Sequence, residues 1–89
     1  MIERELLVAN KLGLHARATA KLVQLLSQFR CGATLSAKGR EVNAKSIMGV
    51  MLLAAGQGTP VVLRVDGDDE SDAAAAVSSL FERLFDEGG

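Results

Sequence analysis

The sequence predicts an α+β fold of two layers, in which helices cover one face of a small β-sheet. Two kinds of segment predict it: stretches in which apolar and polar residues alternate, and stretches with apolar residues at helical spacing. Along the chain these segments follow the order β-α-β-β-α-β-α. With 89 residues, of which 48% are hydrophobic, the chain fits a single domain over residues 1–89 with one core.

The first strand and the first helix are predicted in the N-terminal third of the chain. Residues 2–9 alternate, and one face of this predicted strand carries Ile2, Leu6 and Val8. Residues 10–13 include asparagine and glycine and are predicted to form a loop. Residues 16–28 are predicted to form a helix whose buried stripe consists of Thr19, Leu22, Val23 and Leu26, with Phe29 just beyond its end.

A hairpin and a short helix are predicted next. Residues 33–37 alternate, Lys38-Gly39 is typical of a tight turn, and residues 40–43 are predicted to pair back along the preceding strand. Ser46 is a typical N-cap, because its hydroxyl can accept a hydrogen bond from a free backbone N–H group. It therefore predicts a helix over residues 47–53.

One more strand and one more helix are predicted in the C-terminal third. Gly56 and Gly58 are predicted to end the preceding helix region. Pro60 can start a strand, and the buried face of that strand is predicted to carry Val61, Leu63 and Val65. Residues 66–68 predict a turn. The last helix is predicted over residues 70–85, with a buried stripe of Ala73, Ala76, Val77, Leu80 and Leu84.

Composition excludes several classes of function. Ten basic and eleven acidic residues give a net charge of −1, whereas nucleic-acid-binding domains carry a basic excess. No apolar run approaches the roughly 18 residues that a membrane-spanning helix needs, and no secretory signal is expected at the N-terminus. Cys31 is the only cysteine, which fits a reducing compartment. We therefore expect a cytoplasmic protein in which Cys31 is half-buried and inert.

The only histidine, His15, follows a glycine-containing loop and stands where the first helix begins. Free backbone N–H groups at a helix N-terminus favour an anion, and Arg17 offers a fork of donors suited to phosphate oxygens. An imidazole here is a candidate nucleophile for a phosphoryl group. A histidine with only a loop or capping role fits the same local sequence, so both interpretations stay open on these residues alone. No metal site is predicted, because His15 has no partner histidine.

Two segments resemble a known family. Gly13-Leu14-His15-Ala16-Arg17 is similar to the active-site signature of HPr, the histidine-containing phosphocarrier family of the bacterial phosphotransferase system. Lys45-Ser46-Ile47-Met48-Gly49-Val50-Met51 is similar to the second signature of that family, around its regulatory serine. The distance between the segments, the chain length and the order of elements also match. The resemblance thus covers nearly the whole chain.

The resemblance implies a function and a fold. His15 would be phosphorylated on Nδ1 by phospho-enzyme I and would donate to an enzyme IIA-type acceptor, so the protein would be a phosphoryl carrier and not an enzyme in its own right. Arg17 and the backbone N–H groups of Ala16 and Arg17 would hold the phosphoryl group, with no cofactor. Ser46 would be the target of an HPr kinase/phosphorylase. The family fold is an open-faced β-sandwich, with a four-stranded antiparallel sheet and three helices on one side.

An apolar surface is expected beside His15. A short helix over residues 47–53 cannot bury all of its apolar side chains on one face, so some should enter the core while others, with Ala16 and Ala20, remain exposed. In the family this region is the shared surface for several partners. We expect a monomeric protein whose partner contacts come from Ala20, Ile47, Met48 and Met51, with Leu52 a weaker candidate.

One position departs from the family signature. Ala18 stands where a proline usually follows the arginine. Alanine is compatible with a helix, so we expect the site to form with a slightly less pre-organised first turn. The departure leaves two relays open: sugar uptake, or a nitrogen-type relay in which the phosphorylation state mainly signals to partner proteins.

Overall fold

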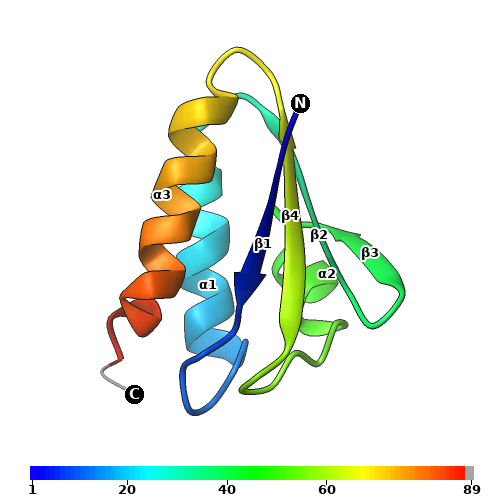
Figure 1. Cartoon of the computed structure of the whole chain (residues 1–89), viewed down its shortest axis with the longest axis vertical. Coiled ribbons are helices and arrows are strands. Elements are labelled where there is room, and N and C mark those ends of the chain that lie inside the picture. Colours follow the sequence, from blue (N-terminus) through cyan, green and yellow to red (C-terminus); the bar gives the residue numbers. More distant parts are fainter. Residues whose placement is uncertain (88–89) are drawn as a thin grey trace.

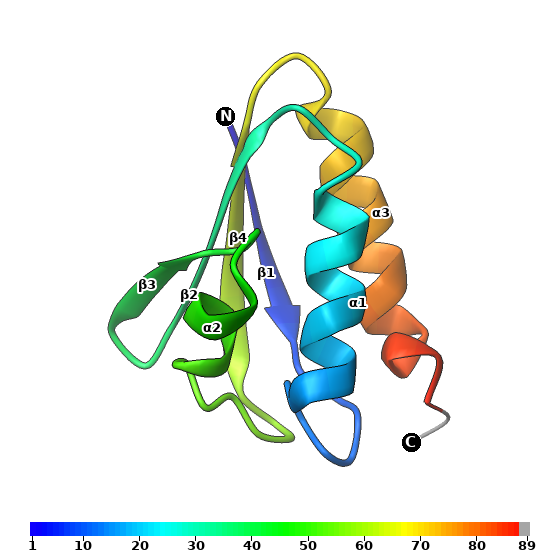
Figure 2. The same cartoon turned by 180° about the vertical axis from the view of Figure 1, so that it is seen from behind.

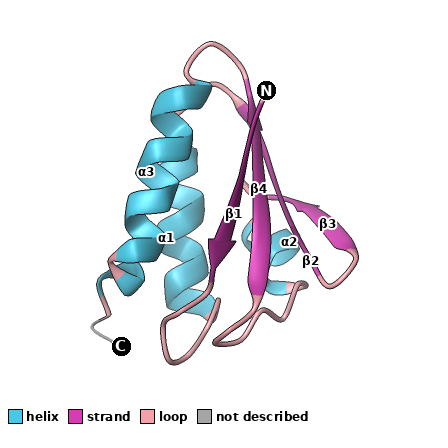
Figure 3. Cartoon of the chain, in the orientation of Figure 1, coloured by secondary structure: helices cyan, strands magenta, loops and turns pink. Residues whose placement is uncertain are grey.

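The structure, a computed structural model, describes residues 1–87 and has the predicted two-layer α+β architecture (Figure 1). The strands are β1 (Ile2–Leu7), β2 (Gly32–Ala37), β3 (Arg40–Asn43) and β4 (Pro60–Asp66). They form one antiparallel sheet in the order β1-β4-β2-β3. The helices α1 (Ala16–Leu26), α2 (Ile47–Met51) and α3 (Glu70–Glu82) lie on one side of it (Figure 3). Gly88 and Gly89, the end of the predicted domain, lie outside the described residues.

The two faces of the sheet differ as the alternation predicts. The face toward the helices is apolar, and its fully buried side chains include Leu35, Val61, Leu63 and Val65. The opposite face is open and charged. There Arg64 pairs with Glu3 of β1 at 3.0 Å and with Glu41 of β3 at 3.3 Å. Exposed ion pairs of this kind add little stability, so the sheet depends on its apolar face.

Strand β1 and helix α1 turn their predicted faces toward the core but end earlier than expected, and Ile2 and Leu6 of β1 are only half-buried. Strand β1 ends at Leu7, although the fully buried Val8 still donates its N–H to Thr59 O at 3.0 Å. Helix α1 buries the predicted stripe and ends at Leu26 rather than at residue 28. The chain leaves it through a turn in which the N–H of Phe29 donates to Leu26 O at 3.1 Å.

Helix α2 begins as predicted and ends differently. The hydroxyl of Ser46 accepts a hydrogen bond from the N–H of Gly49 at 3.1 Å, which confirms Ser46 as the N-cap. The prediction that the helix reaches residue 53 and is ended by glycines is wrong. It ends at Met51, and the chain reverses at Ala54, which takes a positive φ of 49°. The reversal carries the side chain of Leu53, 3% exposed, into the core.

Helix α3 ends at Glu82, before the predicted residue 85, because the backbone then passes from right-handed to left-handed helical conformation. Residues Leu84–Asp86 form a single left-handed turn, η1, with φ between 54° and 60°. A left-handed residue other than glycine costs about 1–2 kcal/mol. Burial of Phe85 offsets part of this cost. Its side chain is fully buried, and the centroid of its ring lies 4.8 Å from that of Phe81.

The buried side chains of the last helix differ in part from the predicted stripe. Ala76 and Leu84 were predicted in the stripe but are half-buried, whereas Ala74 and Phe81 are buried.

Cys31 was predicted to be half-buried and is 1% exposed, because it lies under the turn at Gly67. None of the helices within residues 1–87 is long and apolar enough to cross a bilayer.

Candidate functional site

A glycine turn places His15 at the start of α1. The N–H of Gly13 donates to Asn10 O at 3.1 Å, and the N–H of Leu14 donates to Ala55 O at 2.8 Å. Gly13 has a φ of 68°, and a Cβ atom there would lie 2.5 Å from Ala55 O. The close approach of these two chain segments therefore requires glycine. His15 follows in an extended conformation and is the N-cap residue of α1.

The N-terminus of α1 is open beside the imidazole. The carbonyl of His15 accepts the N–H of Thr19 at 2.9 Å, but no side chain caps the helix. The first N–H groups of a helix, here those of Ala16 and Arg17, have no partner within the helix and carry partial positive charge. Ala18 is fully buried in a regular first turn, so the departure from proline leaves the helix intact, as predicted.

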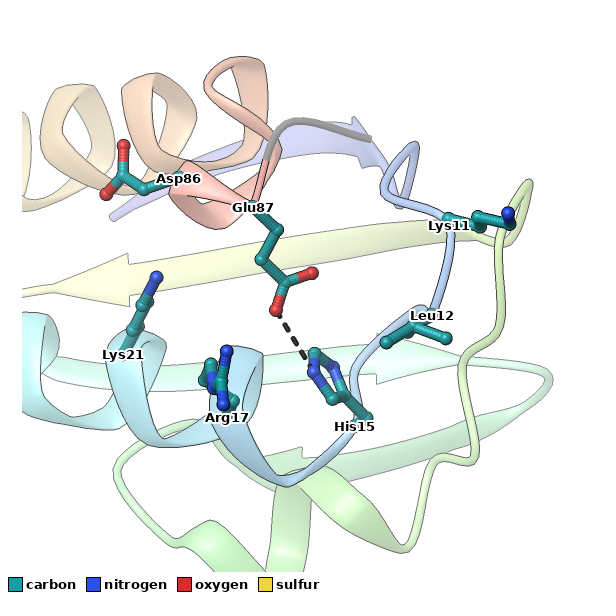
Figure 4. A pocket seen from close by; sticks show the side chains of 7 residues that line it. All are labelled: Lys11, Leu12, His15, Arg17, Lys21, Asp86 and Glu87. Atoms are coloured by element: carbon teal, nitrogen blue, oxygen red, sulfur yellow. Dashed lines mark ion pairs between the residues drawn. The ribbon is translucent and has the colours of Figure 1, made fainter.

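The imidazole of His15 has an acceptor on each side. Its Nδ1 lies 3.1 Å from Gly13 O, and its Nε2 lies 3.0 Å from Glu87 Oε2 (Figure 4). The second contact has the distance of an ion pair but not the alignment of a hydrogen bond, since Glu87 Oε2 has no hydrogen-bond partner within residues 1–87. The His15 side chain is 29% exposed and is therefore reachable from solvent.

Positive charge dominates the pocket into which His15 faces. Its lining consists of Lys11, Leu12, His15, Arg17, Lys21, Asp86 and Glu87 (Figure 4). The ammonium of Lys21 donates to Phe85 O at 2.6 Å. The guanidinium of Arg17 is exposed and makes no hydrogen bond or ion pair with residues 1–87. Arg17 is thus placed beside His15 with its donors available to an anion.

The other predicted site residues lie outside this pocket, on or near α2. Helix α2 packs beside α1 (Figure 2). All four of its predicted apolar candidates are exposed: Ile47, Met48, Met51 and Leu52. The expectation that some of them enter the core is wrong, because Val50 and Leu53 fill that place. Ala20 is half-buried on α1, and Ser46 is half-buried at the cap of α2.

Three residues of the site were missed by sequence reasoning. Leu12 is 67% exposed next to His15 and adds to the apolar surface. Asn10 is fully buried, and its amide donates to Gly13 O at 2.7 Å and to Glu87 Oε1 at 3.0 Å. Glu87 is far from His15 in the sequence, and the turn η1 places it next to the imidazole. The local signal for Asn10 is an asparagine in the loop just before Gly13. No local signal marks Glu87.

Comparisons with known proteins show the family to which the chain belongs. The family described as PTS HPr component phosphorylation site matches residues 2–83. The phosphocarrier protein HPr of Xylella fastidiosa (strain 9a5c) is 68% identical, and the match covers 98% of each chain. The phosphocarrier protein HPr of Cupriavidus necator is 52% identical, and the match covers 99% of each chain. A crystal structure of HPr from Thermoanaerobacter tengcongensis has a TM-score of 0.95, 44% identity and 98% coverage of both chains. The chain therefore belongs to the HPr family, the phosphocarrier proteins of the phosphotransferase system, which carry phosphoryl groups and are not catalysts.

Proposed function

We propose that His15 is the residue that carries the phosphoryl group, accepting it on Nδ1 from phospho-enzyme I and passing it to an enzyme IIA-type acceptor. The observation that carries this proposal is the position of the imidazole: it is the N-cap of α1, partly exposed, and it opens into a pocket with three cationic side chains. Free N–H groups and cations placed in advance favour the negative charge that a phosphoryl group brings.

Arg17 and the backbone N–H groups of Ala16 and Arg17 are the proposed ligands of the phosphoryl oxygens. A guanidinium binds phosphate through two parallel hydrogen bonds, and that of Arg17 is free of other partners within residues 1–87. The phosphoryl group moves from a histidine of phospho-enzyme I to a histidine of this protein, so the bond broken and the bond formed are similar. The carrier therefore supplies a nucleophile and groups that balance the charge, and the partner supplies the rest of the site.

Intact-mass measurement tests the assignment of His15. The protein is incubated with phosphoenolpyruvate and enzyme I, and its mass is recorded before and after brief acid treatment. We expect the gain of one phosphoryl group that acid removes, and no gain for His15→Gln. Because the chain has a single histidine, an acid-labile gain that survives this substitution contradicts the proposal. Arg17→Ala should keep the modification but slow it.

The exposed apolar side chains beside the pocket are the proposed docking surface for enzyme I and enzyme IIA-type acceptors. Met48 is 80% exposed, and contiguous exposed apolar surface of this kind marks interaction sites. Ala20, Ile47 and Met51 complete the surface. Met48→Glu should weaken the binding of enzyme I without changing the thermal unfolding temperature, whereas Leu7→Glu, on β1, should leave binding unchanged. Equal binding by both variants contradicts this surface.

A regulatory role of Ser46 is the second proposed function. The Ser46 hydroxyl is half-buried and caps α2, adjacent to the exposed side chains of the docking surface, so a phosphate there would add negative charge where partners bind. Incubation with ATP and an HPr kinase/phosphorylase should add an acid-stable phosphoryl group that Ser46→Ala abolishes. An unmodified wild-type protein would remove this second function and leave the carrier function standing.

We further propose a cytoplasmic monomer, because phospho-enzyme I must reach His15 directly. Sedimentation of the purified protein tests the monomer. Two relays stay open as predictions: one that serves sugar uptake and one that serves nitrogen-type signalling. To distinguish them, the phosphorylated protein is offered a sugar-type and a nitrogen-type enzyme IIA acceptor, and transfer to each is measured.

A further inference from the structure

The sulfur-containing residues of the chain, one cysteine and three methionines, differ in how far solvent reaches them. Cys31 is 1% exposed and lies under the turn at Gly67, where an added Cβ atom would lie 2.7 Å from Cys31 Cα. Burial raises the pKa of its thiol, and the carboxylate of Asp69 raises the pKa further. Oxidants attack the thiolate, so the thiol is protected in the folded protein.

The three thioethers, in contrast, are open to solvent. Met48 is 80% exposed, more than any other large apolar side chain of residues 1–87, and Met1 and Met51 are 68% and 44% exposed. A thioether has no proton to lose before it reacts, so its accessibility decides whether an oxidant reaches the sulfur. Oxidation of this protein is therefore directed to methionine and away from cysteine.

Met48 and Met51 lie together on α2, within the proposed docking surface. Residues three positions apart are neighbours on a helix surface. The contacts of this region with the core come from Val50, 0% exposed, and from Leu53, 3% exposed, just beyond the helix. The hydroxyl of Ser46 is the N-cap, and neither sulfur takes part in it. A change at both sulfur atoms therefore alters the docking surface and leaves the packing and the cap of α2 in place.

We propose that Met48 and Met51 are oxidation sites, and that peroxides acting there reversibly weaken the docking of enzyme I and enzyme IIA-type acceptors. This inference rests on the proposed docking surface. The thioether sulfur attacks one oxygen of hydrogen peroxide, a sulfur–oxygen bond forms, and the oxygen–oxygen bond breaks. The transferred hydroxyl gives its proton to the leaving hydroxide, which departs as water. The sulfur is oxidised by two electrons, and the peroxide is reduced by two.

The product, a sulfoxide, adds a polar group to the docking surface. Oxidation turns a flexible apolar side chain into a polar one, and reductases restore the thioether. When a partner covers this surface, the sulfoxide oxygen loses its water, which is costly unless the partner supplies a hydrogen-bond donor. A partner surface that matches apolar side chains supplies none. Oxidation should therefore weaken docking without unfolding the chain.

Treatment of the purified protein with hydrogen peroxide, stopped with catalase, tests this inference. Peptide mass spectrometry should find one added oxygen atom on Met48 and on Met51, and none on Cys31. The affinity for enzyme I, measured by calorimetry, should fall by at least about tenfold, the effect of losing the burial of one methionine side chain. The thermal unfolding temperature should be nearly unchanged. Methionine sulfoxide reductases of both stereospecificities, with dithiothreitol, should restore the affinity.

Met1 is an internal control in the same molecule. Its ammonium group pairs with Glu70 Oε2 at 3.0 Å where α3 begins, away from α2 (Figures 1 and 2). The double substitution Met48→Leu with Met51→Leu keeps a similar apolar volume, removes both reactive thioethers and leaves Met1 to be oxidised. Whatever its own starting affinity, this double variant should bind enzyme I equally well before and after peroxide.

The possible outcomes separate this inference from the proposed function. Oxidation of Met48 and Met51 without loss of affinity overturns the inference, and so does oxidation that reaches Met1 alone. An equal loss in the double variant overturns it too, because the effect then comes from another residue. A loss that accompanies a large fall in the unfolding temperature assigns the effect to unfolding and overturns it as well. If the untreated protein neither binds enzyme I nor accepts a phosphoryl group, the proposed function itself fails, and this inference fails with it.

Discussion

At the scale of single residues, Gly13 decides where His15 stands. Its left-handed conformation and its contact with Ala55 O both exclude a side chain. Gly39 has a similar φ of 78°, but a Cβ atom there would have no neighbour within 4 Å. We expect Gly13→Ala to lower the free energy of unfolding by about 1–3 kcal/mol, and Gly39→Ala to lower it less, because only backbone strain acts there. Urea unfolding measures both; equal losses would contradict the role of the Ala55 contact.

Cys31 yields a second prediction at the residue scale. Burial raises the pKa of its thiol, and the carboxylate of Asp69 raises the pKa further. The thiolate is the reactive form, so the folded protein should react with a thiol reagent only through unfolding. Labelling with an aromatic disulfide should be slow in buffer and fast in urea above the unfolding midpoint. Rapid labelling of the native protein would show that the cover over Cys31 opens.

At the scale of elements, α2 depends on its cap more than a longer helix would. It has five residues, and the Ser46 hydroxyl satisfies the N–H of Gly49. Ser46→Ala should lower the free energy of unfolding by about 1 kcal/mol, the usual cost of a lost N-cap. Thermal unfolding checks this, with Ser71→Ala on the exposed face of α3 as the control. No difference between the two variants would mean that α2 is held by Val50 and Leu53 alone.

The elements also show where sequence reasoning succeeds. The stripe of α1 and the alternation of β2 and β4 are local patterns, and the buried faces they predict are observed. The cap of α2 is equally local. The left-handed turn η1 has no local signal, because none of Leu84, Phe85 and Asp86 is a glycine; it depends on burying Phe85 against a distant part of the chain.

The same distinction applies to the site. His15 and Arg17 are two residues apart, and a helix start brings both to one pocket, so the sequence predicts them together. The contact between His15 and Glu87 joins opposite ends of the chain and depends on η1 and on Asn10. No spacing rule reaches across that distance, and the two residues that complete the surroundings of the imidazole could only be found in three dimensions.

At the scale of the whole molecule, stability should depend on pH through Asp69. Its carboxylate accepts the N–H groups of Arg30 at 2.8 Å and Cys31 at 2.9 Å, and these hydrogen bonds, that of Arg30 first, lower its pKa. A folded-state pKa below the unfolded value stabilises the protein at pH above about 4, and this stabilisation is lost as the pH falls through the folded value.

Asp69→Asn tests this pH dependence. The variant should unfold at a lower temperature than the wild type at pH 7, and the difference should shrink as the pH falls below about 4, the ordinary value of an aspartate. Asp68→Asn, an exposed neighbour without a hydrogen bond among residues 1–87, is the control and should follow the wild type at every pH. A difference for Asp69→Asn that does not change with pH would assign the effect to packing rather than to charge.

The order of strands in the sheet has a consequence for how the chain is made. Strand β1 leaves the ribosome before β2, β3 and β4, and within residues 1–87 its strand partner is β4, with Ile2 opposite Val65. At a synthesis rate of about 5–20 residues per second, β1 waits several seconds without a strand partner, while its apolar face is uncovered. Contacts between such distant residues also slow folding. The closing of β1 onto β4 should therefore be a late event, and nascent chains cut off before Pro60 should remain sensitive to proteases.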